Sequence, residues 1–252
     1  MGKLEVNKIY EIDSINGVSQ LPEIDLTITS PPYNLGIDYG VYKDNLPLSN
    51  YITFIKTVFR GVYKATKEGG RICVNVPPDI GVLKERSKIS LDTLYDNILT
   101  ECGFKYRAKI VWHKNQITSR TAWGSFKSPS NPNILPPFEY VLVFYKESPK
   151  KIGEKDNIDI EKEEFIEWTN GLWTIAPESK KKTNHPAPYP EELCKRLIKM
   201  FSYVGDTVFD PFSGSGTTCV TAKKLNRNYL GFELNIEYVD LANERLGLAN
   251  FC

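Results

Sequence analysis

The stretch Asp210-Pro-Phe-Ser-Gly-Ser-Gly-Thr-Thr218 decides the fold, because it joins a predicted strand at 207–209 to a predicted helix at 216–225. Gly214 and Gly216 carry no Cβ, so the backbone there can turn tightly and approach a ligand closely. A helix that begins at such a turn directs unpaired N–H groups toward a negatively charged group. The pattern predicts a ligand site at the carboxyl end of a strand, where open α/β sheets bind ligands.

An acidic residue, Glu233, ends the next predicted strand, at 228–232. An acid at this place can accept hydrogen bonds from both hydroxyls of a ribose. The preceding turn is not a phosphate-binding loop, because Thr217-Thr218 follows Gly216 directly, and it lacks the third glycine of the dinucleotide fingerprint. A nucleoside without a pyrophosphate fits best. Taken alone, the pattern also suits a glycine-rich turn beside an incidental surface acid.

A second motif, Thr29-Ser-Pro-Pro-Tyr-Asn34, follows a predicted buried strand at 25–29. The two prolines end that strand, since proline has no backbone donor and restricts the residue before it. They also fix the carbonyl directions of Ser30 and Pro31. A planar ligand stacked on Tyr33 could have an exocyclic amine held between the Ser30 hydroxyl and a proline carbonyl. Alone, this motif also fits a rigid loop that closes a strand.

Strands and helices alternate along most of the chain, which predicts an α/β fold with a doubly wound, largely parallel sheet. The pattern predicts strands at 9–12, 25–29, 71–76, 106–112, 140–145, 207–209 and 228–232. The first predicted helix begins at a Ser49 cap and continues through Tyr63, and Gly69-Gly70 separate it from the next strand. Further helices are predicted at 91–100, 190–201, 216–225 and 235–246.

Two segments, 114–137 and 146–182, interrupt this alternation and read as irregular. Residues 105–155 contain ten Lys or Arg against three Glu, an excess of seven positive charges, whereas 156–167 contains six acids and one lysine. The basic stretch favours contact with a polyanion. It is also typical of a solvated face.

The composition is that of an ordinary globular protein: 252 residues, 41% hydrophobic, with 32 basic and 31 acidic residues giving a net charge of +1. This length suits one α/β domain. The 5 cysteines are scattered and form no CxxC pair, which favours a reducing compartment over disulfides or a zinc site. Neither a signal-peptide core nor a long apolar run is visible, so we expect a cytoplasmic protein without a membrane segment.

Together with His185-Pro-Ala-Pro-Tyr-Pro190, the two motifs resemble those of the bacterial and archaeal DNA amino-methyltransferases. These enzymes use S-adenosylmethionine to methylate cytosine at N4 or adenine at N6. The order of the motifs, catalytic before cofactor, is similar to the β arrangement of that family. The resemblance implies a circularly permuted Rossmann-like methyltransferase fold with a mixed seven-stranded sheet, helices on both faces, and the residues from 9 to 14 beside the 228–233 strand. It also implies one methyltransferase domain over 1–252, with DNA-recognition insertions at about 114–137 and 146–182.

The resemblance assigns catalysis to Ser30, Pro31, Pro32 and Tyr33. It assigns cofactor binding to Asp13, Ser30, Asp210, Pro211, Phe212, Gly214, Ser215, Gly216, Thr217 and Glu233, with Asp13 near the adenine and Glu233 on the ribose. His185 falls where the family contacts the methionine end, although a loop histidine is an equal reading. For DNA contacts we expect Lys114, Arg120, Trp123 and Lys127, with Trp123 or Phe126 able to fill the gap left by a flipped base. No metal is expected.

The expected reaction is direct methyl transfer to the amine of a flipped base in double-stranded DNA. Ser30 favours cytosine N4, because adenine-specific relatives usually have aspartate there. Adenine N6 is the alternative, and a non-catalytic nucleotide-binding module or an RNA substrate are further ones. Methylation of cytosine C5 is disfavoured, since it needs a cysteine that usually follows a proline and no cysteine here does. The family also implies a restriction endonuclease as partner; a monomer and a homodimer both fit.

Overall fold

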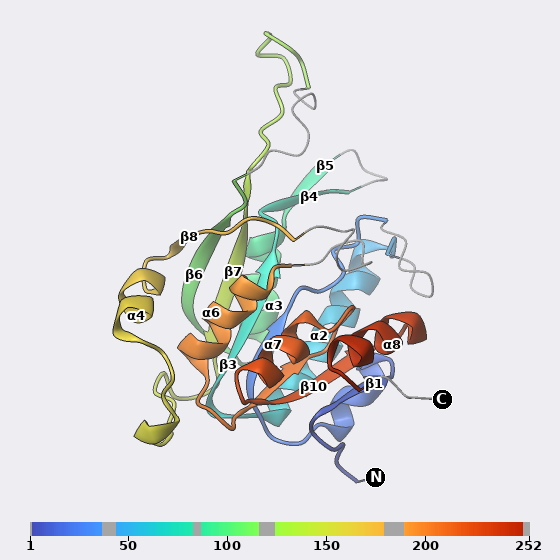
Figure 1. The fold of residues 1–252 in the computed structure, drawn as a ribbon. Coiled ribbons are helices and arrows are strands. Elements are labelled where there is room, and N and C mark those ends of the chain that lie inside the picture. The colour runs from blue at the N-terminus through green and yellow to red at the C-terminus, as the bar shows by residue number, and fades with distance from the viewer. Residues whose placement is uncertain (1, 37–43, 83–86, 116–123, 179–188, 249–252) are drawn as a thin grey trace.

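In the computed structural model, which describes residues 2–36, 44–82, 87–115, 124–178 and 189–248, one mixed sheet of eight strands runs through the molecule (Figure 1). Five neighbouring strands are parallel, and β7 runs antiparallel between β3 and β6. The order across the sheet is β1 (Lys8–Glu11), β10 (Asn228–Glu233), β9 (Thr207–Asp210), β2 (Ile24–Thr29), β3 (Thr66–Val76), β7 (Phe138–Tyr145), β6 (Lys105–His113) and β8 (Leu172–Thr174).

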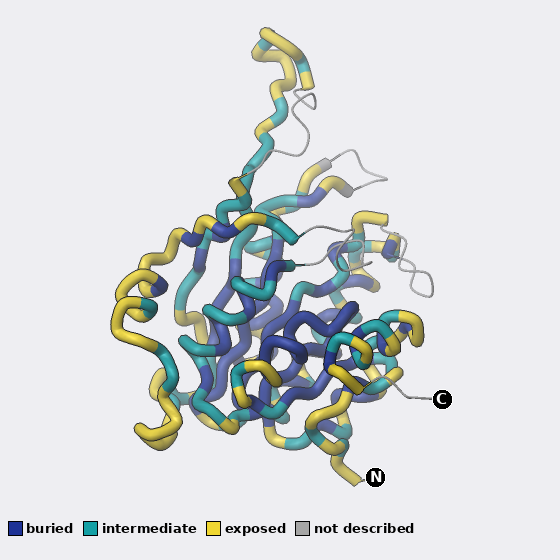
Figure 2. Tube along the Cα trace, viewed as in Figure 1, coloured by how far each residue is buried: buried dark blue, intermediate teal, exposed yellow. Residues whose placement is uncertain are grey.

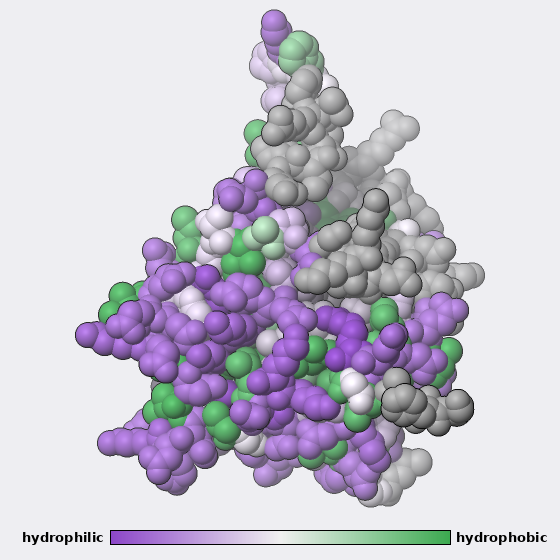
Figure 3. Space-filling view, in the orientation of Figure 1, coloured by the Kyte–Doolittle hydropathy of each residue, from purple (hydrophilic) through white to green (hydrophobic). Residues whose placement is uncertain are grey.

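Helices cover both faces of this sheet, which is buried between them (Figure 2). One apolar core joins the sheet to α2 (Leu48–Ala65) and α3 (Leu91–Glu101). The other joins it to α4 (Lys162–Trp168), α6 (Glu191–Phe201), α7 (Thr217–Lys224) and α8 (Ile236–Arg245). The shorter elements are α1 (Ser14–Gly17), η1 (Val18–Gln20), η2 (Lys155–Asn157), β4 (Asp79–Val82) and β5 (Ser87–Ser90). The outer surface over α6, α7 and α8 is mostly hydrophilic (Figure 3).

The predicted circular permutation is confirmed by the pairing of β1 with β10. The two strands are parallel, with Ile9 opposite Gly231 and Glu11 opposite Glu233. On the other side of β10, β9 pairs with β10 and with β2, so the two motif-bearing strands belong to one sheet, as predicted. The carboxyl ends of β1, β10, β9 and β2 therefore meet at one edge, which we call the upper edge (Figure 1).

The segment 146–182, predicted to be irregular, contains elements that the sequence did not reveal. It contributes the eighth strand, β8, and helix α4, so the sheet has one strand more than predicted. The helix is closed by a capping box between Glu161 and Glu164, and only Trp168 within it is buried. In β8, Trp173 alone is buried. Because α4 and β8 each bury only one side chain, their sequences show no periodic pattern of apolar residues that would predict a helix or a strand.

Two element boundaries also differ from the predictions. Helix α2 begins at Leu48 after Pro47, and no side chain caps it, so the predicted Ser49 cap is wrong. Strand β3 begins at Thr66 and runs through Gly69-Gly70, which were predicted to precede it. Gly69 has a φ of +72°, and a Cβ there would lie 2.6 Å from the Lys150 carbonyl oxygen. The glycine pair thus serves a close backbone approach inside the strand.

No helix among the described residues is long and apolar enough to cross a membrane.

Candidate active site

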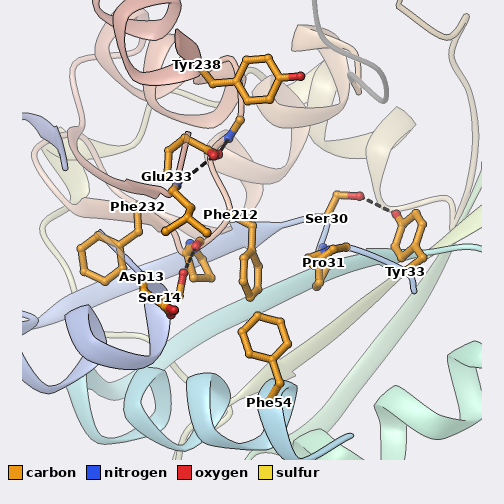
Figure 4. Close-up of a pocket in the computed structure, with 14 residues that line it drawn as sticks. Asp13, Ser14, Ser30, Pro31, Tyr33, Phe54, Phe212, Phe232, Glu233 and Tyr238 are labelled. Atoms are coloured by element: carbon orange, nitrogen blue, oxygen red, sulfur yellow. Dashed lines mark hydrogen bonds between the residues drawn. The ribbon is translucent and has the colours of Figure 1, made fainter. Parts of the chain in front are cut away.

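A pocket opens at the upper edge, where four strand ends converge (Figure 4). Ser30 and Tyr33 lie at one end of it, Asp13 and Glu233 lie toward the other, and Phe212 lies between them. The lining consists of Asp13, Ser14, Ser30, Pro31, Pro32, Tyr33, Phe54, Pro211, Phe212, Gly214, Phe232, Glu233, Leu234 and Tyr238. The structure thus brings the predicted catalytic motif and much of the predicted cofactor set to one cavity.

Glu233 is held by three backbone N–H groups. Gly214 N donates to Oε2 at 2.8 Å, and Leu234 N and Asn235 N donate to Oε1 at 2.9 Å each. Burial raises the pKa of Glu233 above its ordinary value, and these three donors partly offset that effect. The carboxylate is therefore fixed in direction at the pocket wall, and its remaining lone pairs can accept from a ligand.

Asp210 lies beneath the turn and does not line the pocket. Its buried carboxylate accepts from Thr29 Oγ1 at 2.7 Å, Phe212 N at 3.0 Å, Thr218 Oγ1 at 2.8 Å and Tyr189 Oη at 3.0 Å. Burial raises its pKa, and the four donors oppose the rise. Asp210 thus organises the turn that a ligand meets, and it links the strand of the catalytic motif to the strand of the cofactor motif.

Ser215, Gly216 and Thr217 are buried and are not among the lining residues either. Arg245 of α8 donates to the Ser215 carbonyl at 2.5 Å and to Thr217 Oγ1 at 3.2 Å. Gly216 has a φ of +77°, and a Cβ there would lie 2.7 Å from Ala242 Cβ. At Gly216 the glycine thus serves helix packing, whereas Gly214 lines the pocket itself.

The N-terminal segment closes one side of the cavity. Asp13 caps α1, where its side chain accepts from Ile15 N at 2.8 Å. The next residue, Ser14, donates its hydroxyl hydrogen to the Pro211 carbonyl and so joins the N-terminal segment to the turn after β9. Asp13 lines the same cavity as Glu233, and its position near the cofactor adenine stays a prediction.

Several lining residues were not predicted: Ser14, Phe54, Phe232, Leu234 and Tyr238. Phe54 belongs to the apolar stripe of α2, and its ring centroid lies 5.8 Å from that of Phe212. An aromatic residue in an apolar stripe looks like core, so the sequence held no signal for this role. For Tyr238 the sequence did offer a signal, because this residue lies in the first turn of α8, the helix that follows Glu233.

The Ser30 hydroxyl takes part in a hydrogen-bond network that the sequence also did not reveal. It lies 2.5 Å from Tyr33 Oη, which donates to the Asn75 carbonyl at 3.0 Å. The Asn75 side-chain nitrogen donates to Glu139 Oε2 at 2.5 Å and to Tyr33 Oη at 3.2 Å. The other Glu139 oxygen pairs with Lys114. Asn75 and Glu139 lie on β3 and β7, outside the catalytic and cofactor motifs.

The first predicted DNA-recognition segment projects beyond the upper edge (Figure 1). Residues 114–115 and 124–137 of this segment are described; a bridge between Gly124 and Pro132 closes the part 124–137, which we call the finger. Phe126 on the finger is 64% exposed, and Lys127 lies over its ring at 5.4 Å. Arg120, Trp123 and His185 lie outside the described residues. Lys114 is turned inward onto Glu139 and lies 5.0 Å from the Trp112 ring centroid.

The basic stretch 105–155 does not form one continuous surface. Lys109 pairs with Asp92 on α3 at 2.7 Å, and Lys105 pairs with Glu147 at 3.4 Å. Lys146 Nζ donates to the Tyr63 and Thr66 carbonyls at the end of α2, at 2.9 and 2.8 Å. Lys151 pairs at 2.7 Å with the buried Asp25, which lies at the amino end of β2, opposite the pocket. These four lysines therefore contact groups of the protein itself.

The comparisons with known proteins agree with this geometry, in which a permuted α/β sheet places a nucleoside-type pocket beside a Ser-Pro-Pro-Tyr motif. Residues 24–244 match the N6_N4_Mtase family model, described as DNA methylase. The chain therefore belongs to this DNA methylase family.

Similar individual proteins include the type II methyltransferase M.MjaVI of Methanocaldococcus jannaschii, 44% identical over 183 residues that cover 69% of this chain and 91% of that protein. M.HpaI of Haemophilus parainfluenzae is 30% identical over 246 residues, covering 93% of this chain and 72% of that protein. Among solved structures, TTHA0409 of Thermus thermophilus in complex with S-adenosyl-L-methionine has a TM-score of 0.77 and 28% identity, covering 95% of this chain and 93% of that one. The cytosine-N4-specific PvuII DNA methyltransferase, 22% identical with a TM-score of 0.75, covers 100% of this chain and 89% of that one and shows the same fold.

S-adenosylmethionine is the cofactor of this family, and the described pocket fits it. The ligand combines a flat adenine, a ribose with two hydroxyls and a sulfonium cation. The pocket offers the Phe212 ring and the Phe232 side chain, the directed carboxylate of Glu233, and a second acid, Asp13. Among the described residues, no group of three or more His, Cys, Asp or Glu could hold a metal ion.

Proposed function

We propose that this methyltransferase methylates the exocyclic N4 amine of cytosine in double-stranded DNA. The observation that carries this proposal is the position of Ser30, whose hydroxyl lies at the pocket end opposite Glu233. A cofactor with its ribose on Glu233 and its methionine part toward Ser30 would present its methyl group beside the catalytic motif. A base amine bound at Ser30 would then lie in line with that methyl group.

Within this site, the protein contributes position and directed dipoles. When bound, S-adenosylmethionine supplies an electrophilic methyl group on its sulfonium. The Ser30 oxygen and a carbonyl of the Pro31-Pro32 pair accept hydrogen bonds from the two amine hydrogens, which leaves the nitrogen lone pair directed at the methyl carbon. Tyr33, which lines the pocket, offers its ring to the flipped base. The nitrogen gains the methyl group and loses one hydrogen as a proton.

Ser30 also supports cytosine over adenine. A hydroxyl is a weaker acceptor than the carboxylate usual in adenine-specific relatives, and the smaller cytosine ring suits a short side chain. Both bases present a similar N–C–NH₂ edge, so adenine N6 is the second candidate.

DNA binding is proposed for the finger and for 116–123, where Arg120 and Trp123 lie. The finger projects from the edge that holds the pocket, and its exposed Phe126 and Lys127 offer a ring to a vacated base position and a charge to phosphate. In the second proposed recognition segment, 146–182, Lys151 and α4 are not expected to contact DNA, because Lys151 is paired with Asp25 and α4 packs against α6. We propose that all these parts form one methyltransferase domain over 1–252.

A restriction–modification system is the proposed setting, since M.MjaVI and M.HpaI are type II methyltransferases. A cognate endonuclease would then recognise the same DNA sequence. One relative, 33% identical over 256 residues, is the orphan methyltransferase M.BamHII of Bacillus amyloliquefaciens, so a chain of this kind also suits a setting without that partner.

The test is incubation with tritium-labelled S-adenosylmethionine and either mixed-sequence duplex DNA or RNA, followed by chromatography of the nucleosides. We expect label in N4-methylcytosine from DNA. N6-methyladenine as the sole product would establish the second candidate, and label only in RNA would replace the DNA substrate. No label in either would leave a binding module. In the same assay Ser30→Ala should nearly abolish transfer while cofactor binding persists, because the serine acts on the amine.

A further inference from the structure

Ser30, Tyr33, Asn75 and Glu139, which we call the polar corner, come from three neighbouring strands. Ser30 follows β2, Asn75 is the penultimate residue of β3, and Glu139 is the second residue of β7. The pairing of β3 with β7 places Asn75 opposite Val141, two residues from Glu139. The sheet itself therefore fixes the distance between the catalytic loop and the Glu139 carboxylate.

The hydrogen-bond directions in the polar corner follow from the number of hydrogens available. Glu139 accepts from Asn75, and a carboxylate can only accept, so the nitrogen of the Asn75 carboxamide must face it. Tyr33 has one hydroxyl hydrogen, and it is committed to the Asn75 carbonyl oxygen. The contact between Ser30 Oγ and Tyr33 Oη can then be made only by the hydrogen of Ser30. Ser30 Oγ also accepts a long contact from the Asn75 side-chain nitrogen at 3.5 Å, which leaves one lone pair for a ligand.

A second observation concerns the side-chain oxygen of the Asn75 carboxamide. Asn75 is 5% exposed, and its side-chain oxygen is buried with no hydrogen-bond partner among the described residues. A buried acceptor left unsatisfied costs about 1–3 kcal/mol, so such atoms are normally paired. The Asn75 carboxamide is instead held through its nitrogen, so the contacts with Glu139 and Tyr33 set its orientation.

We propose that Asn75 and Glu139 are positioning residues that hold the Ser30 hydroxyl as a hydrogen-bond acceptor for the target amine. Glu139 orients the Asn75 carboxamide, Asn75 orients the Tyr33 hydroxyl, and Tyr33 takes the Ser30 hydrogen. This inference rests on the proposed function, since it needs an amine substrate at Ser30. It makes the acceptor character of Glu139, rather than its ion pair with Lys114, the property that matters.

The test compares single-turnover transfer of labelled methyl to duplex DNA by wild type, Glu139→Gln, Glu139→Leu, Asn75→Ala and the Glu139→Leu/Asn75→Ala pair. Glutamine keeps an oxygen for the Asn75 nitrogen, whereas leucine removes it. Because a net hydrogen bond is worth about 1 kcal/mol and more when charged, we expect Glu139→Leu and Asn75→Ala each to slow transfer about tenfold. Glu139→Gln should stay within about threefold of wild type.

The double variant should be no slower than Asn75→Ala, because Glu139 acts only through Asn75. Glu147→Leu is the matched control: Glu147 follows the other end of β7, is exposed, and should leave the rate unchanged. Cofactor affinity, measured by calorimetry, should stay within about twofold in every variant.

Equal losses in Glu139→Gln and Glu139→Leu, multiplied losses in the double variant, or a parallel loss of cofactor affinity would each overturn the inference. A wild-type protein that transfers no methyl to DNA would instead overturn the proposed function.

Discussion

Glu233 shows how one residue combines structural and ligand-binding roles. Its two oxygens are directed by the backbone of Gly214, Leu234 and Asn235, so the carboxylate is fixed before any ligand arrives. A fixed acceptor loses little conformational entropy on binding, which raises the affinity that two hydrogen bonds can supply.

We expect Glu233→Ala to weaken S-adenosylmethionine binding more than tenfold while the fold persists. The lost contribution is a pair of hydrogen bonds to a charged acceptor, about 1.5–3 kcal/mol each. Calorimetry measures the affinity, and circular dichroism checks the fold. An unchanged dissociation constant in a folded variant would place the ribose elsewhere.

The raised pKa of Glu233 also makes cofactor binding depend on pH. The ionised carboxylate is the form that accepts from both ribose hydroxyls. As the pH falls through the raised pKa, this form is lost and the affinity declines, and binding in that range releases a proton. Calorimetry in two buffers of different ionisation enthalpy measures the release. The Glu233→Gln variant has no titrating group at this position, while the neighbouring Asp210 is unchanged, so it should release fewer protons on cofactor binding. Equal proton release by the variant and the wild type would show that another group releases the proton.

Residue roles were predictable from the sequence only where a motif marks them. Ser30 and Glu233 stand beside prolines and glycines that interrupt regular structure. Asn75 and Glu139 lie inside strands made mostly of buried or half-buried residues, so the adjacent sequence does not indicate that the two side chains contact each other. Their proximity arises from strand pairing across 64 residues, which a single sequence does not display.

At the scale of elements, the lysine of the finger differs from the lysines of β6 and of the loop after β7 in what its charge contacts. Lys127 is exposed at the upper edge, whereas Lys109, Lys146 and Lys151 are bonded to acids or carbonyl groups of the fold. Only an exposed charge such as that of Lys127 can neutralise a DNA phosphate and so release counterions when the protein binds DNA.

Lys127→Ala should therefore lower the slope of log affinity against log salt by roughly 0.9, the value for one phosphate contact. Fluorescence anisotropy with duplex DNA over a range of salt concentrations gives the slope. Lys155→Ala is the matched control, because Lys155 is exposed on η2, whose Asn157 carbonyl bonds to Val204 ahead of β9, away from the finger. A slope unchanged in Lys127→Ala would show that the finger does not contact phosphate.

Element prediction worked where burial is periodic and failed where it is not. The apolar stripe of α2 has five buried residues and was recognised, as was the fully buried β2. Helix α4 and strand β8 each bury one tryptophan, Trp168 and Trp173, and otherwise expose most of their side chains. These elements owe their stability to tertiary packing, which local sequence does not express.

At the scale of the whole molecule, the pocket is built from segments that lie far apart in the sequence. Asp13 and Glu233, at nearly opposite positions of the chain, face the same cavity, and Ser14 is bonded to Pro211. Cofactor binding must therefore be linked to the stability of the entire sheet.

We expect a cofactor concentration of about 100 times the dissociation constant to raise the free energy of unfolding by about 2.7 kcal/mol. Hydrogen exchange should slow together in β1, β9, β10 and β2, since all four contribute their ends to the site. Slowing confined to the turn at 210–217 would show that the pocket opens without unfolding the sheet.

The pairing of Lys8 with Leu230 has a consequence for synthesis on the ribosome. Translation proceeds at about 5–20 residues per second, so β1 emerges on the order of tens of seconds before β10 exists to pair with it. Throughout that interval the wall formed by Asp13 and Ser14 has no partner turn, and the cofactor has no complete cavity to enter. A nascent chain is therefore unable to transfer a methyl group until the β10 segment has been added.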